Sequence, residues 1–333
     1  MFTHEMIKSF NQLEMDVYNY IISNEEKVVY MKVRELAEAV HVSTTTILRF
    51  CKKVGCEGYS EFRLKLKQEV SSKEKKKINI IEVGPRDGFQ SVRGDFIPTE
   101  LKKEIIDLLV DAGVKHLEYT SFVSPKAIPQ LADAAEVSEY VLSKYPDLDL
   151  MVLVPNMRGA TNAHNLGVKK VCNVVSYSAS HNKANINRTH EESLNAYREM
   201  VEAYPDMECV LDLATTFGCP FEGKGGKYQD PDAIMEFLRP YKEAGMKTVN
   251  YCDTIGVADP EQVKKVIRAS QKAYPDVHIQ VHLHDTRGLG MVNAMAAIEC
   301  GVTDVQTALA GLGGCPFAPG ASGNLSTEDT VWM

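Results

Sequence analysis

Residues 78–120 read INIIEVGPRDGFQSVRGDFIPTELKKEIIDLLVDAGVKHLEYT and contain one strand–helix–strand unit. The apolar runs Ile78–Val83 and Val114–Tyr119 have the length of buried strands, and Glu100–Ala112 between them has helical periodicity. Two strands that are joined through a helix pair in parallel. The unit therefore predicts an α/β fold with a parallel sheet.

The same alternation continues along the chain. Further apolar runs lie at 148–154, 170–175, 209–214, 248–252, 279–283 and 305–310, with helical stretches such as 191–203, 231–244 and 261–274 between them. Eight strands in strict alternation fit a closed (β/α)8 TIM barrel better than an open doubly wound sheet. No G-x-G-x-x-G follows the first strand, which disfavours a dinucleotide-binding sheet. We predict a barrel over residues 78–333, truncated in its last helix because Ser326–Met333 only begins one.

Residues 71–77, SSKEKKK, are a charged linker between two segments of different charge. Residues 1–77 hold 14 Lys and Arg against 11 Asp and Glu, whereas residues 78–333 hold 23 against 34. The acidic barrel argues against a long nucleic-acid surface there. No apolar run approaches a membrane span or a signal peptide, and the eight cysteines lack framework spacing. We expect a cytoplasmic protein with free thiols and no membrane contact.

Residues 1–70 have the pattern of a small all-α domain with a helix-turn-helix. Val33–Val40 has helical spacing, Val42-Ser43 interrupts it, and Ser43 is placed to cap a second helix, Thr44–Lys53. That helix carries the short polar and basic side chains that a groove-reading helix needs. The candidate DNA contacts are Thr44, Thr45, Arg49 and Lys52. Helical hairpins are common, so periodicity alone leaves DNA binding open.

Two histidines mark the end of the seventh strand. In Val281-His282-Leu283-His284 the imidazoles stand at i and i+2 and point to one side of the strand. A metal ion would give both a partner, although a purely structural pair remains an alternative. Asp87 after the first strand and Asn324 after the eighth complete an O, N, N, O set. Such ligands suit Mg²⁺ or Mn²⁺ better than structural zinc and leave two positions for a chelating substrate.

Other strand ends carry weaker signals. Arg86 stands beside Asp87 in a Gly- and Pro-rich turn, where an ordinary surface ion pair is the alternative. Glu118 ends the second strand and Asp253 the sixth. Cys315 lies in a glycine-rich loop after the eighth strand and is either a reactive thiol or a small buried residue.

Several longer motifs resemble known families. NIIEVGPRDGFQ, LEYTSFVSPK, FGCPFEGK, YCDTIGV, VHLHDTRG and AGLGGCPFAPGASGNLSTED occur in order over residues 79–329. They closely resemble the hydroxymethylglutaryl-CoA lyase branch of the DRE-TIM metallolyases. Residues 33–66, VRELAEAVHVSTTTILRFCKKVGCEGYSEFRLKL, resemble the N-terminal domain of RpiR-type transcriptional regulators.

The resemblance implies roles for the candidate residues. It makes Asp87, His282, His284 and Asn324 the ligands of a divalent metal, and Arg86 the group that stabilises the enolate oxygen of departing acetyl-CoA. Glu118 and Asp253 match catalytic carboxylates, and Cys315 matches a proton-transferring thiol on a mobile loop. Gln90 and Thr254 match supporting residues at the substrate. The resemblance also implies the reaction, which is cleavage of 3-hydroxy-3-methylglutaryl-CoA to acetyl-CoA and acetoacetate. It further implies a role in leucine degradation and a homodimer.

Departures from the families leave alternatives. Ala179 stands where relatives commonly carry Glu, so a related 3-hydroxyacyl-CoA is a second possible substrate. RpiR-type regulators usually continue into a sugar-phosphate-binding domain, and lyases of this branch continue past the position of Met333. A DNA-binding regulator with an inactive or ligand-sensing barrel is therefore an alternative function. A join of two gene fragments is another reading, which would not change the chemistry of the barrel.

Overall fold

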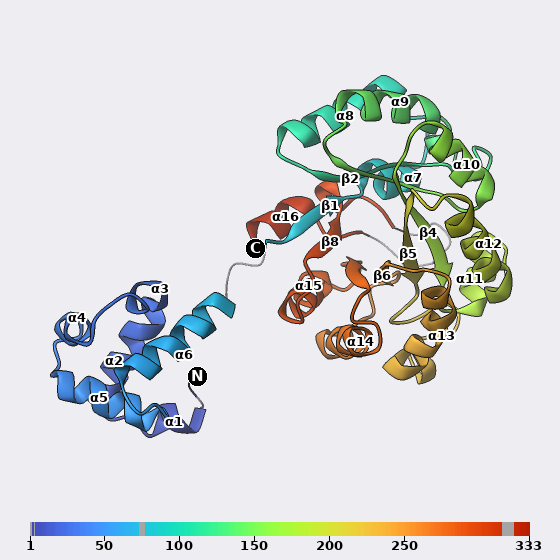
Figure 1. Cartoon of the computed structure of the whole chain (residues 1–333). Coiled ribbons are helices and arrows are strands. Elements are labelled where there is room, and N and C mark those ends of the chain that lie inside the picture. The colour runs from blue at the N-terminus through green and yellow to red at the C-terminus, as the bar shows by residue number, and fades with distance from the viewer. Residues whose placement is uncertain (1, 3, 73–76, 315–322) are drawn as a thin grey trace. The chain divides into compact units, whose positions relative to one another are not determined.

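The structure, a computed structural model, describes residues 2, 4–72, 77–314 and 323–333. The chain divides into two compact units, Met1–Lys77 and Ile78–Met333, and each unit has its own hydrophobic core (Figure 1). Most of the predicted linker, residues 73–76, lies outside the described residues. No helix in the described part of the chain is long and apolar enough to cross a membrane.

The first unit consists of short helices around one apolar core. Its helices are α1 (His4–Lys8), α2 (Gln12–Ser23), α3 (Glu25–Val28), α4 (Val33–Ala39), α5 (Thr44–Lys53) and α6 (Tyr59–Ser72). The predicted cap at Ser43 is confirmed, because its Oγ accepts the backbone N–H of Thr46 at 3.1 Å. Ile47 and Phe50 bury the inner face of α5 completely. The predicted helix-turn-helix is therefore present, with α5 as its second helix.

The second unit is the predicted (β/α)8 barrel. Its parallel strands pair in chain order and β8 closes on β1 (Figure 1). The strands are β1 (Asn79–Glu82), β2 (His116–Ser121), β3 (Asp149–Leu153), β4 (Lys170–Ser176), β5 (Glu208–Ala214), β6 (Thr248–Asp253), β7 (His278–Leu283) and β8 (Asp304–Thr307). Closure brings β1 and β8 side by side, so the segments that follow these two strands are neighbours at the mouth of the barrel.

Helices surround the strands and begin at clear capping signals. They are α7 (Phe89–Ser91), α8 (Thr99–Asp111), α9 (Ala134–Lys144), α10 (Met157–Asn165), α11 (Ala179–Ile186), α12 (His190–Ala203), α13 (Pro231–Glu243), α14 (Pro260–Ala273), α15 (Gly290–Glu299) and α16 (Thr327–Trp332). Asp230 and Asp259 cap α13 and α14, and a proline opens each helix at its first position. A π-helical turn, η1 (Gly84–Gly88), follows β1.

Charged side chains connect the first residues of several strands at the N-terminal end of the barrel. Nδ1 of His116 lies 2.9 Å from Oδ2 of Asp149, which also accepts Nζ of Lys170 at 3.0 Å. On β7 and β8, Nε2 of His278 lies 3.0 Å from Oδ2 of Asp304. These pairs cross from one strand to the next, so they stabilise the closed sheet at the end away from the barrel mouth.

The His278–Asp304 pair predicts a pH-dependent contribution to stability. The hydrogen bond with Asp304 raises the pKa of His278 above its ordinary value, against the effect of burial. Its stabilisation is complete below the unfolded pKa of about 6.5 and is lost as the pH rises through the higher folded pKa. We expect His278→Gln to lower the Tm more at pH 6 than at pH 9. The corresponding loss in the free energy of unfolding is under about 1 kcal/mol, because the imidazole is half exposed. Calorimetry that finds equal losses at both pH values would contradict this.

Candidate active site

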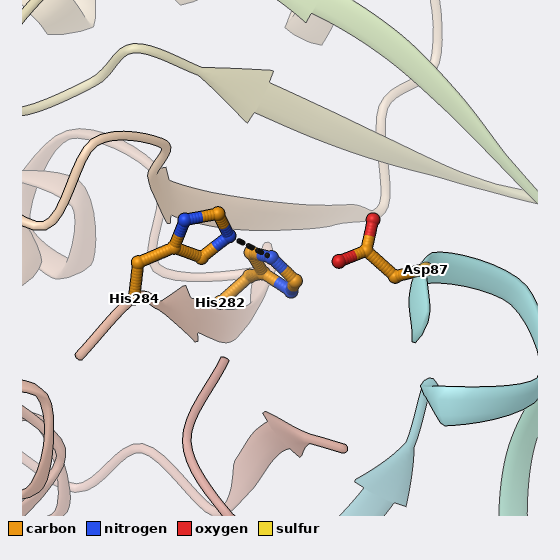
Figure 2. Close-up of side chains that lie close together, drawn as sticks. All are labelled: Asp87, His282 and His284. Atoms are coloured by element: carbon orange, nitrogen blue, oxygen red, sulfur yellow. Dashed lines mark hydrogen bonds between the residues drawn. The ribbon is translucent and has the colours of Figure 1, made fainter. Parts of the chain in front are cut away.

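Three potential metal ligands converge at the C-terminal end of the barrel. Asp87 comes from the turn η1 after β1, His282 lies near the end of β7, and His284 follows that strand. One ligand atom from each residue lies within 4.8 Å of the others, and all three side chains are buried. Figure 2 shows the two imidazoles and the carboxylate facing one region. The strand pairing β7–β8–β1 is what brings them together.

Both imidazoles are neutral in this environment. Burial lowers the pKa of His282, and burial together with neighbouring His282 lowers the pKa of His284 to about 3. Oε1 of Gln306 can only accept, so Nδ1 of His282, 2.9 Å away, carries the proton and donates it. The lone pair of His282 is therefore on Nε2, which lies 3.0 Å from Nε2 of His284. A neutral imidazole with a fixed tautomer is the form that binds a metal.

Asp87 supplies the negative charge of this group. Burial alone would raise its pKa, but the Arg86 guanidinium lowers it below its ordinary value. Oδ1 of Asp87 accepts Nη1 of Arg86 and Nε2 of Gln90, each at 2.6 Å. The carboxylate is thus ionised and held in place from one side.

Asn324 reaches the same carboxylate from the segment after β8. Its Nδ2 donates to Oδ2 of Asp87 at 2.7 Å, and its backbone forms a bridge with that of His284. Its Oδ1 is buried and has no hydrogen-bond partner among the described residues. Rotation of the amide by half a turn would exchange its two end atoms and place that oxygen beside Asp87. One carboxylate, two imidazoles and an amide with an unused oxygen fit a hard divalent cation.

Arg86 is a second fixed charge of the site. Its Nε and Nη2 donate to the two oxygens of Glu118 at 2.7 and 2.8 Å, and Nη1 donates to Asp87. Burial opposes the charge, but the two carboxylates raise the pKa of Arg86 well above its usual range. Such a bidentate pair holds the guanidinium in one orientation.

The metal-ligand group opens into a cavity of about 310 Å³. Its wall includes Arg86, Asp87, Gln90, Thr254, His282 and His284. The rest of the lining combines apolar side chains, among them Val123, Ile128 and Leu153, with polar ones such as Asn156 and Asp212. This arrangement suits a ligand with a polar, metal-binding end and an apolar remainder.

Two of the described residues that were predicted to be catalytic, Glu118 and Asp253, do not line this cavity. Asp253 is buried beside it, and its two carboxylate oxygens accept the backbone N–H groups of Val257 and Ala258 at 3.0 and 2.9 Å. Burial raises the pKa of Asp253 to about 6. The contacts observed for Asp253 are therefore with its own loop. Cys315 lies outside the described residues, so its catalytic role stays a prediction.

Two residues that the sequence did not single out also organise the site. Gln306 orients His282, as described above. Glu82, the last residue of β1, accepts the backbone N–H groups of Gly84 and Leu309 at 2.7 and 2.9 Å and Oγ1 of Thr327 at 2.5 Å. It therefore joins the segments after β1 and β8. The sequence signal that could have identified Glu82 is a single carboxylate directly after the apolar residues of a buried strand.

A closed (β/α)8 barrel with an O/N ligand group at its C-terminal mouth is the architecture of a TIM-barrel enzyme. Residues 77–333 match the HMGL-like family, and residues 4–73 match the helix-turn-helix domain of the rpiR family. The chain therefore belongs to the HMGL-like family, with an rpiR-family domain in front of the barrel, and the barrel is that of a lyase.

Similar proteins carry the same name in distant organisms. The hydroxymethylglutaryl-CoA lyase of Bacillus subtilis is 38% identical over 260 residues, which cover 78% of this chain and 85% of the relative. The human mitochondrial enzyme is also 38% identical, with 78% of each chain covered. A solved HMG-CoA lyase of A. baumannii, in complex with coenzyme A and 3-methylmalate, has a TM-score of 0.71 at 39% identity, covering 77% of this chain and 82% of that one.

Close packing of Gly313 against the ligand group predicts a metal-binding defect. A Cβ at this glycine would overlap Nδ2 of Asn324 and lie 2.6 Å from Oδ2 of Asp87, and its φ is +126°. We expect Gly313→Ala to displace both side chains and to weaken Mn²⁺ binding about 10-fold or more in titration calorimetry. Gly288→Ala is the matched control, because Gly288 also has a positive φ, +69°, but nothing lies within 4 Å of its Cβ position. Equal Mn²⁺ affinities in the two variants would refute the expectation.

Proposed function

We propose that the barrel cleaves 3-hydroxy-3-methylglutaryl-CoA to acetyl-CoA and acetoacetate in a metal-dependent reaction. The observation that carries this proposal is the joint placement of Asp87, His282 and His284 beside the fixed Arg86 cation at one cavity. The names of the similar lyases point to the same substrate. A related 3-hydroxyacyl-CoA is the alternative, since Ala179 begins α11 where relatives commonly carry Glu.

In this proposal Asp87, His282, His284 and Asn324 hold a Mg²⁺ or Mn²⁺ ion. The ion would make the C3 hydroxyl of the substrate more acidic and neutralise negative charge next to it. The oxygen and nitrogen donors of the described site support a hard cation rather than a thiolate-bound one. The substrate's thioester would extend from this polar end into the cavity.

Arg86 stabilises the negative charge that develops when the C2–C3 bond breaks. The electron pair of that bond moves into the thioester, whose oxygen gains enolate character, and a guanidinium held in advance needs no reorganisation to meet it. Glu118 acts through Arg86, because both its oxygens bind that side chain. Gln90 and Thr254 line the cavity and would contact the substrate. Asp253 would shape the adjoining loop, and Cys315 would act in proton transfer, as the family resemblance implies.

Turnover of 3-hydroxy-3-methylglutaryl-CoA tests the proposal. We expect the protein, with thiol present, to release acetyl-CoA with Mg²⁺ or Mn²⁺ and to stop with EDTA. His282→Ala should lower kcat about 100-fold or more, because it removes a metal ligand. The control is His164→Ala, which replaces a histidine stacked on Tyr204 at the surface. Folded protein without turnover would contradict the lyase proposal and favour a sensing barrel.

The first unit supports a second function, DNA binding. Two observations support it. Residues 4–73 match the rpiR-family domain, and α5 exposes Thr45, Arg49 and Lys52, with Thr44 half-buried at its start. Lys53 has another role, because its Nζ donates to Oε2 of Glu14 at 2.6 Å. We therefore propose that α5 contacts DNA through the four exposed or half-exposed side chains and that Arg49 and Lys52 meet phosphates.

Salt dependence tests this second proposal. We expect a 30-base-pair random duplex to bind with an affinity that falls with salt, and Arg49→Ala combined with Lys52→Ala to reduce the log–log slope by about 2. Lys27→Ala combined with Lys67→Ala is the matched control, since it removes two exposed cations outside α5. Fluorescence anisotropy gives both slopes. A control slope reduced as much as that of the α5 variant would rule out α5 as the contact.

A further inference from the structure

Asp212 is a buried carboxyl of the cavity wall that the proposed reaction has not used. It lies on β5, is 3% exposed and lines the cavity. Nδ2 of Asn250, on neighbouring β6, donates to its Oδ1 at 2.9 Å. Among the described side chains no Lys, Arg or His forms an ion pair with it. Asp212 therefore faces the cavity without a countercharge.

The groups around Asp212 explain why it has no cation partner. Arg86 from η1 is near, but its guanidinium binds Glu118 and Asp87. Glu118 on β2 adds negative charge, while the buried thiols of Cys172 on β4 and Cys252 on β6 are uncharged. Burial and then Glu118 raise the pKa of Asp212 to about 7.

Keeping such a carboxyl costs stability. An acid whose folded pKa is raised is destabilising wherever the unfolded chain would ionise it, which at neutral pH is always the case for Asp. An amide of the same shape would avoid that cost. A residue that is unfavourable for folding and exposed to a reaction cavity is expected to have a chemical task.

Few other side chains of the wall can move a proton at neutral pH. Apart from the three proposed metal ligands and two arginines, the described wall contains three titratable residues, His181, Asp212 and Cys252. Burial lowers the pKa of His181 to about 4 and raises that of Cys252 well above its ordinary value. Of the three, only Asp212 has a pKa that its surroundings shift toward neutral pH, which suits a group that first accepts and then donates a proton.

On the basis of the proposed lyase function, we propose that Asp212 is a catalytic residue, the base that removes the proton of the substrate's C3 hydroxyl. The proton passes from the hydroxyl oxygen to the Asp212 carboxylate, and the oxygen's electron pair forms the C3 carbonyl. The C2–C3 bond breaks, and its electron pair enters the thioester enolate next to Arg86. Protonation of C2 then gives the acetyl thioester, and release of the proton from Asp212 balances it, so no oxidant or further reactant is needed.

The test is Asp212→Asn in the full-length protein, with Mn²⁺ present. We expect kcat to fall about 100-fold or more, the size of a lost proton-transfer catalyst. The wild-type kcat/KM should rise with pH through about 7, because the base must be ionised, and the variant should lose this rise. Mn²⁺ affinity should stay within about threefold, since Asp212 is not a proposed ligand. The Tm at pH 8 should be equal or higher, because the uncompensated buried charge is gone.

Asp304→Asn is the matched control. Asp304 is also a buried carboxyl of a barrel strand, but it pairs with His278 at the opposite end of the barrel. We expect it to lower the Tm and leave kcat unchanged. Wild-type protein without turnover would overturn the lyase proposal and this inference together. An active wild type with Asp212→Asn within about threefold of its kcat, or with Mn²⁺ binding lost, would overturn this inference alone.

Discussion

Arg86 is a guanidinium buried at the mouth of the barrel, where a cation without partners would be too costly to keep. Two carboxylates from different segments meet it, Glu118 through both oxygens and Asp87 through one. Because the guanidinium takes up these contacts, Asp87 is ionised and fixed beside the imidazoles, and Asp212 has no cation. One buried charge network therefore determines both the candidate metal site and the unpaired acid of the cavity.

This network depends on closure of the sheet. Asp87 and Asn324 are 237 residues apart in the chain, yet their side chains lie 2.7 Å from each other. They meet because β8 pairs with β1, and Glu82 connects the two segments that follow those strands. The absence of a side chain at Gly313 allows the loop to approach both residues. The geometry of the site is thus a consequence of a long-range strand pairing.

Asp304 and Asp212 are buried carboxyls of barrel strands that differ in their partners. At the N-terminal end, acids and bases pair across strands, as Asp304 does with His278, and the pairing stabilises the fold. At the C-terminal end, Asp212 has an amide partner but no cation, and burial raises its pKa. A fold can keep such an unfavourable group where a substrate uses it, since stability lost there is recovered in the rest of the core.

Local pattern was enough to predict the elements and several side chains of the site. Strand and helix periodicity identified the closed barrel and the helix-turn-helix, and Ser43 was recognised as a cap because capping depends on neighbouring residues. The i, i+2 spacing placed His282 and His284 on one side of their strand for the same reason. Only the tertiary structure showed that Gln306 orients His282, that Asp253 binds its own loop and that Asp212 lacks a countercharge. Those facts depend on contacts between distant strands and on burial, and neither quantity is encoded in the spacing of residues along a single segment.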